Sequence, residues 1–377
     1  MRRWHTIALI GTLAAIALYA ILHNHFKPEE DNRQIRIGAI LPLTGTASNY
    51  GEMMERGIRI ALEEIADDPE LSKANIKIVI EDSRSSPKDG VAAFQKLVTI
   101  DETPAVMPAL SGIILGCVPI AEQNGTTLLN CPANSPKLRG AGKHVFNLYP
   151  LSDQESKSLA KYAYGNMNAR SAAVVYVDND SGRGYRDSFA SEFANLGGTV
   201  PLSESHQQGT SDFRATIEKL RGAAVDLVFI CSYYAESARL LKQADELDYR
   251  PKWLSYSSVE TPDFQKIVGS SAEGLVYSQP GFDVESKDPA TRRFVEKYRS
   301  RYQEAPDIWS AQFYDGTMLL ASAIASGART GEDISNFLSN LKDAPSSCGP
   351  VTFDQQGCVS REIKFKVVKS GEFHESQ

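Results

Sequence analysis

Length, composition and charge narrow the classes of protein to which this chain can belong. It has 377 residues, enough for two domains of ordinary size that each bury their own core. The hydrophobic fraction of 42% and the charged fraction of 23% are those of a globular protein rather than a disordered one. A net charge of −7, with no basic stripe along the sequence, argues against a nucleic-acid partner.

Residues 1–34 read as an export segment plus linker rather than as part of the fold. Two arginines precede an uncharged run at residues 6–22, and a polar stretch follows. This order is typical of a secretory signal peptide, for which Ala15 and Ala17 offer a small-residue cleavage site. The run is slightly long for a signal and slightly short for a membrane span, so an uncleaved anchor is the alternative. Either way we expect the body of the protein in the periplasm or another extracytoplasmic space.

Strands and helices are predicted to alternate through the first half of the body. Helical i, i+3, i+4 spacing of apolar residues runs from Met54 to Ile65, between the first two predicted strands. The alternation predicts a parallel sheet with helices on both faces. The apolar runs that predict its strands lie at residues 34–41, 75–81, 105–107 and 127–129.

The same rhythm repeats from about residue 151, which predicts a second α/β unit. Ser152 and Glu155 have the spacing of a capping box, so a helix is expected to begin there. Predicted strands follow at residues 172–177, 200–206, 226–231, 252–256 and 274–278. From about residue 282 the pattern becomes helical, and the chain ends in two predicted strands at residues 351–354 and 362–368.

The five cysteines leave the pairing open. Cys348 and Cys358 flank a predicted hairpin and are the candidate disulfide. Cys117 and Cys131 lie at one predicted sheet edge and form an alternative pair. Cys231 ends an apolar strand, where a buried thiol is expected.

Catalytic and metal-binding patterns are missing from the sequence. It contains no G-x-S-x-G motif and no G-x-G-x-x-G motif, and its histidines form no metal-spaced cluster. The stretch RGAGKH at residues 139–144 lacks two positions of a phosphate-binding loop. We therefore predict a protein that is not an enzyme and uses no cofactor or metal, with an exported enzyme as the remote alternative.

Aromatic and small polar residues recur directly after the predicted strands of both units. Ligands of open α/β sheets bind at the carboxyl ends of strands, and a helix N-terminus there suits a carboxylate. Tyrosines pack against an apolar ligand body and bond its polar end. The recurrence predicts a cleft shared by the two units. Its candidate residues are Tyr50, Ser111, Ala133, Asn134, Tyr233, Tyr234, Tyr256, Ser257 and Ser258.

Several of these stretches resemble one known family. IRIGAILPLTGTASNYGEMMERGIRIALEEI is similar to the opening strand, loop and helix of the type I periplasmic binding proteins. The most similar branch binds branched-chain amino acids and related amides. PAVMPALSGIILGCVPIAEQNGTTLLNCPANSPKL, FICSYYAESARLLKQADELDYRPKWLSY and GPVTFDQQGC match that branch in order and spacing. The resemblance covers about residues 35–370.

The family implies a fold, a mechanism and partners. It implies two doubly wound α/β lobes with parallel sheets, joined by a three-strand hinge and closing on a ligand between them. Residues 35–150 and 284–348 would form the N-terminal lobe, and residues 151–283 and 349–377 the C-terminal lobe. The protein would be a monomeric receptor that binds an amino acid, amide or small carboxylate and delivers it to the membrane permease of an ABC importer. A membrane-anchored sensor with the same lobes is the alternative.

The resemblance also assigns the groups that hold a ligand's carboxylate and side chain. Ser111 takes the position of the serine that holds the α-carboxylate. Pro132, Ala133 and Asn134 match the stretch that completes this grip, with Asn134 where a threonine is usual. Tyr50 takes the position of an aromatic residue that lines the side-chain pocket.

The family's ammonium-binding positions are only partly kept. Tyr233 takes the position of a tyrosine that receives the α-ammonium, but Ser257 stands where an acidic residue is usual. Glu260, three residues on, is the candidate substitute. Ser181 also replaces a tyrosine common in its loop, which predicts a wider pocket. Because a buried ammonium needs a partner, the departure at Ser257 leaves a ligand without an ammonium open.

Overall fold

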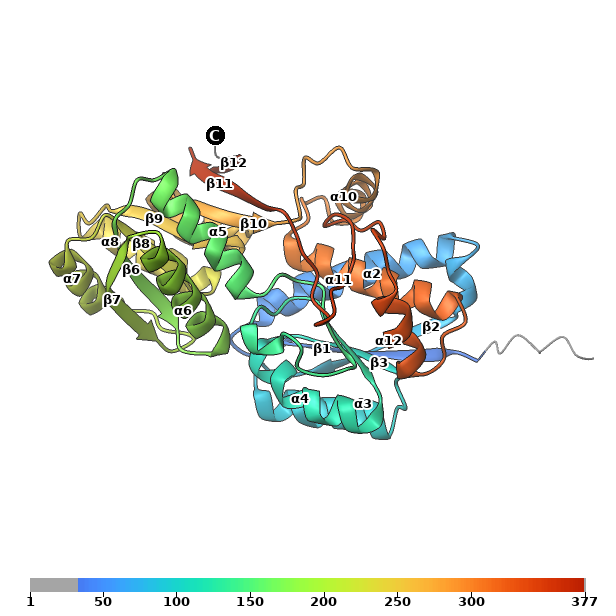
Figure 1. Ribbon diagram of the computed structural model, residues 1–377. Coiled ribbons are helices and arrows are strands. Elements are labelled where there is room, and N and C mark those ends of the chain that lie inside the picture. The colour runs from blue at the N-terminus through green and yellow to red at the C-terminus, as the bar shows by residue number, and fades with distance from the viewer. Residues whose placement is uncertain (1–32, 376–377) are drawn as a thin grey trace, which may run out of the picture. The chain divides into compact units, whose positions relative to one another are not determined.

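The computed structural model describes residues 33–375, in which strands and helices alternate (Figure 1). The strands are β1 (Ile35–Leu41), β2 (Ile76–Asp82), β3 (Ala105–Pro108), β4 (Thr127–Asn130), β5 (Val145–Asn147), β6 (Ser171–Val177), β7 (Thr199–His206), β8 (Leu227–Cys231), β9 (Lys252–Tyr256), β10 (Val276–Pro280), β11 (Ile363–Lys369) and β12 (Glu372–Glu375). The α-helices are α2 (Ser48–Asp67), α3 (Pro87–Thr99), α4 (Ser111–Asn124), α5 (Ser152–Gly165), α6 (Asp180–Asn195), α7 (Arg214–Ala223), α8 (Tyr234–Glu246), α9 (Pro262–Val268), α10 (Pro289–Tyr302), α11 (Ile308–Ala325) and α12 (Gly331–Ser339).

The first sheet is parallel and has helices on both faces. Its strand order is β2-β1-β3-β4-β5. Successive side chains of a strand point to opposite faces, so Ile37 and Ala39 pack with residues of α2 and α11, whereas Ile40 packs with residues of α3 and α4. Figure 1 shows these two helix pairs, α2 with α11 and α3 with α4.

The second sheet is parallel except at one edge. Its order is β12-β11-β10-β9-β8-β6-β7, in which β11 and β12 each pair antiparallel with their neighbours. Val174 packs with Phe189 of α6 on one face, and Val175 belongs to the cluster of Leu240 of α8 on the other. The fold is therefore the predicted pair of mostly parallel α/β sheets, with an antiparallel edge.

Three connections join the two sheets. The chain passes from β5 to α5, from β10 to α10, and finally through residues 360–362 to β11. Between the second and third connections, α11 packs against α2 and α12 packs against β4 of the first sheet. The late helices therefore complete the first sheet's side of the molecule.

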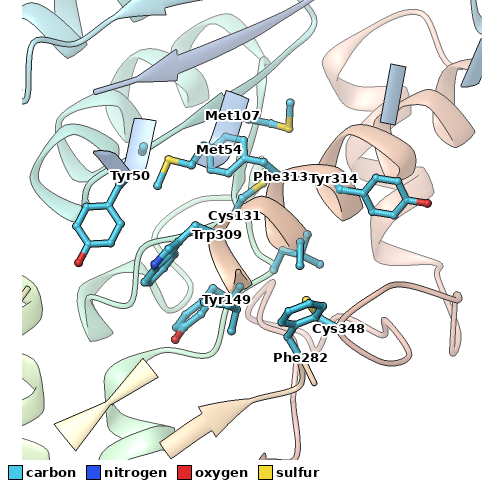
Figure 2. Packing of buried hydrophobic residues seen from close by; sticks show 14 of the residues in the cluster. Tyr50, Met54, Met107, Cys131, Tyr149, Phe282, Trp309, Phe313, Tyr314 and Cys348 are labelled. Carbon is cyan, nitrogen blue, oxygen red and sulfur yellow. The ribbon is translucent and has the colours of Figure 1, made fainter. Parts of the chain in front are cut away.

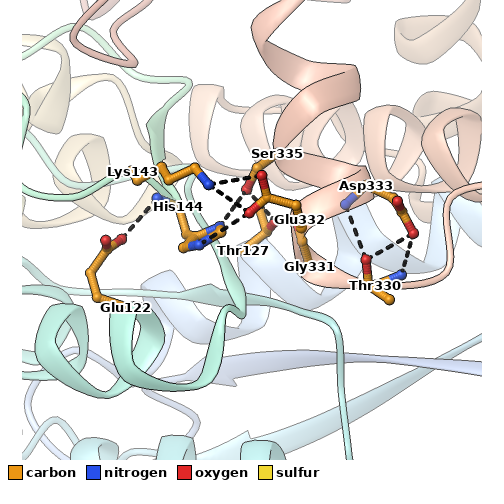
Figure 3. A network of polar contacts seen from close by, with 9 residues as sticks. All are labelled: Glu122, Thr127, Lys143, His144, Thr330, Gly331, Glu332, Asp333 and Ser335. Carbon is orange, nitrogen blue, oxygen red and sulfur yellow. Dashed lines mark hydrogen bonds and ion pairs between the residues drawn. The ribbon is translucent and has the colours of Figure 1, made fainter.

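Polar contacts fix α12 to the first sheet (Figure 3). The Thr127 hydroxyl on β4 donates to the Gly331 carbonyl at 2.7 Å, and the Ser335 hydroxyl lies 2.9 Å from Thr127 and 3.0 Å from Nδ1 of His144. At the helix start, Thr330 and Asp333 form a reciprocal capping box. These bonds tie a late segment to an early strand.

The predicted capping box at Ser152 is wrong. Helix α5 begins at Ser152, but Leu151 is its N-cap and no side chain caps it. Glu155 instead points into the interior, where it accepts hydrogen bonds from Tyr185 and Ser278. The Glu155 carboxyl group therefore makes tertiary contacts instead of the helix-capping contact that the local sequence pattern predicted.

The predicted hairpin near the C-terminus lies with the first sheet. Phe353 and Val359 form an isolated antiparallel bridge rather than a regular strand pair. The Asn147 N–H on β5 donates to the Gly357 carbonyl at 2.7 Å, and Asn147 also bridges Cys358. These contacts differ from the expected boundary, which placed everything after residue 348 in the C-terminal lobe.

The predicted disulfide between Cys348 and Cys358 is not formed, and neither is the alternative pair. All five cysteines are free, buried thiols, as expected for Cys231. The Cys348 N–H bonds Asp315 of α11, whereas Cys358 is held at β5, so their spacing along the chain does not bring them together. Burial raises the pKa of both thiols.

The predicted export segment lies outside the described residues. Within residues 33–375, no helix is both long enough and apolar enough to cross a membrane.

Candidate functional site

A cavity lies at the carboxyl ends of strands from both sheets. This is the edge of an α/β sheet at which ligands bind. Its lining residues come from both sheets' connections and from α11: Tyr50, Met54, Leu110, Ser111, Pro132, Ala133, Asn134, Ser181, Tyr233, Tyr256 and Trp309.

Six of the seven predicted ligand-binding residues line this cavity. They are Tyr50, Ser111, Pro132, Ala133, Asn134 and Tyr233. Ser111, Pro132, Ala133, Asn134 and Tyr233 lie within a few residues of a strand end, which is the placement that the sequence pattern predicts. Tyr50 lies in the first turn of α2, after the loop that follows β1. Ser257 is the exception.

Aromatic rings form one wall of the cavity. Tyr50 packs edge-on against Trp309, with ring centroids 5.5 Å apart (Figure 2). The ring centroids of Tyr50 and Tyr233 lie 5.8 Å apart. The Tyr50 hydroxyl accepts a hydrogen bond from the Tyr234 N–H at 3.1 Å. Burial raises the pKa of Tyr50 well above its usual value, so the phenol is neutral. Such a wall suits an apolar or aromatic ligand body.

The start of α4 supplies the polar end of the cavity. The N–H groups of Ile113 and Ile114 both bond the Leu110 carbonyl, so the helix ladder leaves the N–H groups of Ser111 and Gly112 unused. Leu110 turns into the helix at a φ of 71°, a left-handed conformation that is uncommon outside glycine. The Ser111 hydroxyl beside these N–H groups completes a site suited to an anion.

The loop after β4 contributes a side chain rather than free backbone groups at Ala133. The Ala133 N–H donates to Asn130 Oδ1 at 2.8 Å, and the Ala133 carbonyl accepts from Asn130 Nδ2 at 2.7 Å. Asn134 faces the cavity and bonds two residues of α6, donating to the Tyr185 hydroxyl at 2.9 Å and accepting from the Ser181 hydroxyl. Asn134 is therefore the polar group that this loop offers.

Ser257 and Glu260 are committed elsewhere. The Ser257 hydroxyl lies 2.6 Å from the Tyr149 hydroxyl, and Ser257 does not line the cavity. The Glu260 carboxylate pairs with Lys366 at 2.8 Å and accepts from Tyr277 at 3.0 Å, beside a separate cavity. Glu260 is thus placed away from the position in which it would receive a ligand's ammonium.

None of the described residues that line the cavity has a charged side chain. Within residues 33–375 there is also no cluster of three or more histidine, cysteine or acidic residues that could hold a metal. The cavity therefore offers hydroxyl and amide groups, helix N–H groups and aromatic faces, and it holds no nucleophile–base pair.

Three lining residues were not predicted: Met54, Leu110 and Trp309. Met54 reads in sequence as a core position of an amphipathic helix, and Leu110 directly precedes the predicted Ser111. Trp309 follows the N-cap Asp307 of α11 and reaches the cavity only because the chain returns to the first sheet. The one sequence signal that could have found Trp309 is an aromatic residue at the start of a helix.

The chain is similar to known proteins over most of its length. The family model described as "Periplasmic binding protein" matches residues 34–371. A Leu/Ile/Val-binding protein, BraC3, from Rhizobium johnstonii is 24% identical over 87% of this chain and 89% of its own length. A leucine-, isoleucine-, valine-, threonine- and alanine-binding protein from Pseudomonas aeruginosa is 24% identical over 86% of each chain.

A solved structure shares the fold over nearly its full length. A leucine-binding protein, LivK, from Thermotoga maritima superposes with a TM-score of 0.84 at 25% identity, covering 91% of this chain and 98% of that chain. A benzoate complex of a solute-binding protein from Rhodopseudomonas palustris, at 16% identity and a TM-score of 0.82, shares the fold. The family is one of extracytoplasmic solute-binding proteins rather than enzymes. The chain belongs to the periplasmic binding protein family.

Proposed function

We propose that this protein is the extracytoplasmic receptor of an ABC importer for a small amphipathic acid or amide that lacks an α-ammonium group. The ligand enters the cavity between the two sheets, the lobes close on it by hinge motion, and the closed form presents it to a membrane permease. The observation that carries this proposal is the absence of any charged side chain among the residues that line the cavity.

The missing carboxylate argues against a free α-amino acid. An ammonium removed from water without a partner is costly, and the family's acidic position is Ser257 here. Ser257 bonds Tyr149, and Glu260 bonds Lys366. A ligand without an ammonium needs neither residue.

A carboxylate or amide has partners at the other end. The free N–H groups at the start of α4 and the Ser111 hydroxyl suit an oxygen anion, since the helix N-terminus carries partial positive charge. The wall of Tyr50, Tyr233 and Trp309 suits an apolar or aromatic body. The same fold is found in the leucine-binding protein LivK and in the solute-binding protein in complex with benzoate.

A thermal-shift panel built on matched pairs tests the proposal. Each pair differs only by the ammonium: leucine with 4-methylpentanoate, and phenylalanine with 3-phenylpropanoate, with leucinamide, benzoate and 4-methylpentanamide added. A ligand at one hundred times its Kd adds about 2.7 kcal/mol to stability, enough for a clear rise in melting temperature. We expect the ammonium-free member of a pair to give the larger rise, and larger rises for the amino acids would contradict the proposal.

A further inference from the structure

A buried carboxyl group without a cation lies behind the ligand cavity. Glu155 on α5 is fully buried, and it forms no ion pair with any residue in the range 33–375. Its oxygens accept hydrogen bonds from two hydroxyl groups, that of Ser278 at 2.5 Å and that of Tyr185. Ionising a carboxyl group in such surroundings costs free energy. Whether Glu155 carries a proton can therefore affect the structure around it.

A chain of hydrogen bonds connects this carboxyl to the cavity. Tyr185 bonds Glu155 with its hydroxyl, and the same oxygen accepts from Nδ2 of Asn134 at 2.9 Å. Oδ1 of Asn134 in turn accepts from the Ser181 hydroxyl. Asn134 and Ser181 both line the cavity, so the chain runs from a buried acid of one lobe to the ligand site.

The direction of every bond follows from the charge on Glu155. An ionised carboxylate only accepts, so the Tyr185 hydroxyl donates to it and must accept from Asn134 Nδ2. The side-chain oxygen of Asn134 then faces Ser181 and accepts a hydrogen bond from the Ser181 hydroxyl. In this state the Ser181 hydroxyl can offer only lone pairs to a ligand.

We propose that Glu155 is a positioning residue that sets the direction of hydrogen bonding in the ligand cavity. When a proton binds the carboxyl oxygen facing Tyr185, that oxygen donates and Tyr185 donates onward to Asn134. The Asn134 amide turns over, its Nδ2 donates to Ser181, and the Ser181 hydroxyl is released to donate to a ligand oxygen. One proton is taken up at Glu155, and no other group changes charge.

Glu155 titrates near neutral pH, whereas the titratable groups that face it do not. Burial raises the pKa of Glu155 to about 7. The other titratable groups that face it are the phenols of Tyr149, Tyr185 and Tyr256 and the thiol of Cys231, from the segment after β5 and from α6, β9 and β8. Burial raises the pKa of each of these four groups well above its usual value, so all four stay neutral.

The consequence is a pH-dependent preference in the cavity, and this part rests on the proposed function. A ligand that presents a carboxylate or carbonyl oxygen to Ser181 and Asn134 should bind more tightly at pH 6 than at pH 8. A ligand that presents a donor there should show the opposite order. The cavity would thus favour capture of acids in mildly acidic surroundings.

The first test needs no ligand. The full chain is labelled with ¹⁵N-asparagine, and the side-chain amide signal of Asn134 is assigned by its loss in Asn134→Ala. We expect this signal to shift between pH 5.5 and 8.5 with a midpoint of about 7. Glu155→Gln and Tyr185→Phe should each abolish the shift, because one removes the titrating group and the other removes the link. A signal that is constant with pH in the wild type, or that titrates unchanged in Glu155→Gln, overturns the inference.

Ser278→Ala is the matched control. It removes the hydrogen bond to Glu155 that is not part of the chain, so the Asn134 signal should still titrate, with a higher midpoint. Loss of the titration in this variant as well would mean that any disturbance of Glu155 has the same effect, and would contradict a relay through Tyr185.

A second measurement separates this inference from the proposed function. Calorimetric titration with 3-phenylpropanoate at pH 6 and pH 8 should give at least a threefold tighter Kd at the lower pH, and the same Kd at both in Glu155→Gln. Equal values in the wild type overturn the effect on binding. If neither 3-phenylpropanoate nor the other acids bind at all, the proposed function fails, while the Asn134 titration still decides the role of Glu155.

Discussion

Besides the N–H groups at the start of α4 and the phenols of the tyrosines, single hydroxyl and amide side chains supply polar contacts of the cavity, from Ser111, Ser181 and Asn134. Each can exchange one hydrogen bond with a ligand, and none brings a formal charge into the site. Binding strength should therefore depend on a few individual bonds and on the aromatic wall, which makes single substitutions informative.

Ser111→Ala should weaken binding of whichever acid the thermal-shift panel identifies. A hydrogen bond to a charged group contributes about 1.5–3 kcal/mol, so the Kd should rise roughly 10- to 150-fold. Calorimetric titration measures the change, and Ser300→Ala, on the exposed face of α10, is the control that should leave the Kd unaltered.

Tyr233→Ala should also weaken binding, because it removes a ring that packs 5.8 Å from Tyr50 in the wall. We expect the same method to show a loss of at least tenfold with the circular dichroism spectrum preserved. Unchanged affinity in both the Ser111 and the Tyr233 variants would remove these residues from the site.

At the residue scale, the sequence predicted those site residues whose polar or aromatic side chains follow a strand. Ser111 and Tyr233 each follow an apolar strand, so the parallel topology predicts that each lies at the carboxyl edge of its own sheet, where ligands bind. Glu155 shows the limit of such reasoning, since its local spacing indicated a helix cap. Its real partners, Tyr185 and Ser278, are 30 and 123 residues away and are set by tertiary packing.

Secondary-structure elements position the site through close helix packing on the first sheet. α2 carries Tyr50 and Met54, and α11 carries Trp309, so the distance between these helices fixes the aromatic wall. They approach closely at Gly57, where an added β-carbon would lie 2.0 Å from the Ser310 carbonyl oxygen. Only a residue without a side chain permits this approach.

Gly57→Ala should therefore destabilise the protein by about 1–3 kcal/mol or more, through overpacking against backbone that cannot yield. Urea unfolding measures the loss. Gly222→Ala on α7 is the matched control, since an added β-carbon there meets nothing within 4 Å. Alanine should leave stability there unchanged or raise it by up to about 1 kcal/mol. Equal effects at the two sites would contradict the packing argument.

Element positions were largely predictable, whereas the late contacts between elements were not. β9 matches its predicted range, and α10 begins at Pro289, within the region predicted to be helical. The sequence of residues 351–359 predicts an ordinary hairpin. It does not predict the contact of this segment with Asn147 of β5, because Asn147 lies about 200 positions earlier in the chain. Long-range bridges of this kind leave no periodic signal in sequence.

At the scale of the whole molecule, the buried acid should make stability depend on pH. Glu155 is protonated in the folded state up to about pH 7, whereas in the unfolded chain it ionises near its ordinary pKa of 4.5. The folded state therefore holds more protons between these values, so the contribution of Glu155 to the free energy of unfolding falls as pH rises from 4.5 to 7. The total fall is about 3 kcal/mol.

Glu155→Gln should remove this fall. The difference in free energy of unfolding between variant and wild type should grow in the variant's favour from pH 5 to pH 8, as measured by urea unfolding at several pH values. Glu246→Gln, at an exposed position on α8, is the control and should run parallel to the wild type. Parallel profiles for Glu155→Gln as well would show that this carboxyl does not titrate in the folded protein over that range.

The two-lobe architecture could be predicted from sequence, whereas the ligand chemistry needed the structure. Alternating strands and helices, together with the family resemblance, gave both sheets and the strand-end site. Sequence left Glu260 open as a substitute for the acid missing at Ser257, because three residues of separation suggest proximity. The structure pairs Glu260 with Lys366 on β11, a strand that arrives only through the third connection. The uncharged cavity is thus a property of the assembled molecule.

Calorimetric titration of the wild-type protein with leucine and 4-methylpentanoate, in parallel and in one buffer, tests the central claim most directly. The two ligands share the isobutyl body and the carboxylate, and only leucine carries an ammonium. The uncharged cavity predicts that 4-methylpentanoate binds at least tenfold more tightly than leucine. Equal or tighter binding of leucine would contradict the account, and would mean that the aromatic faces and hydroxyls of the cavity hold an ammonium without a carboxylate.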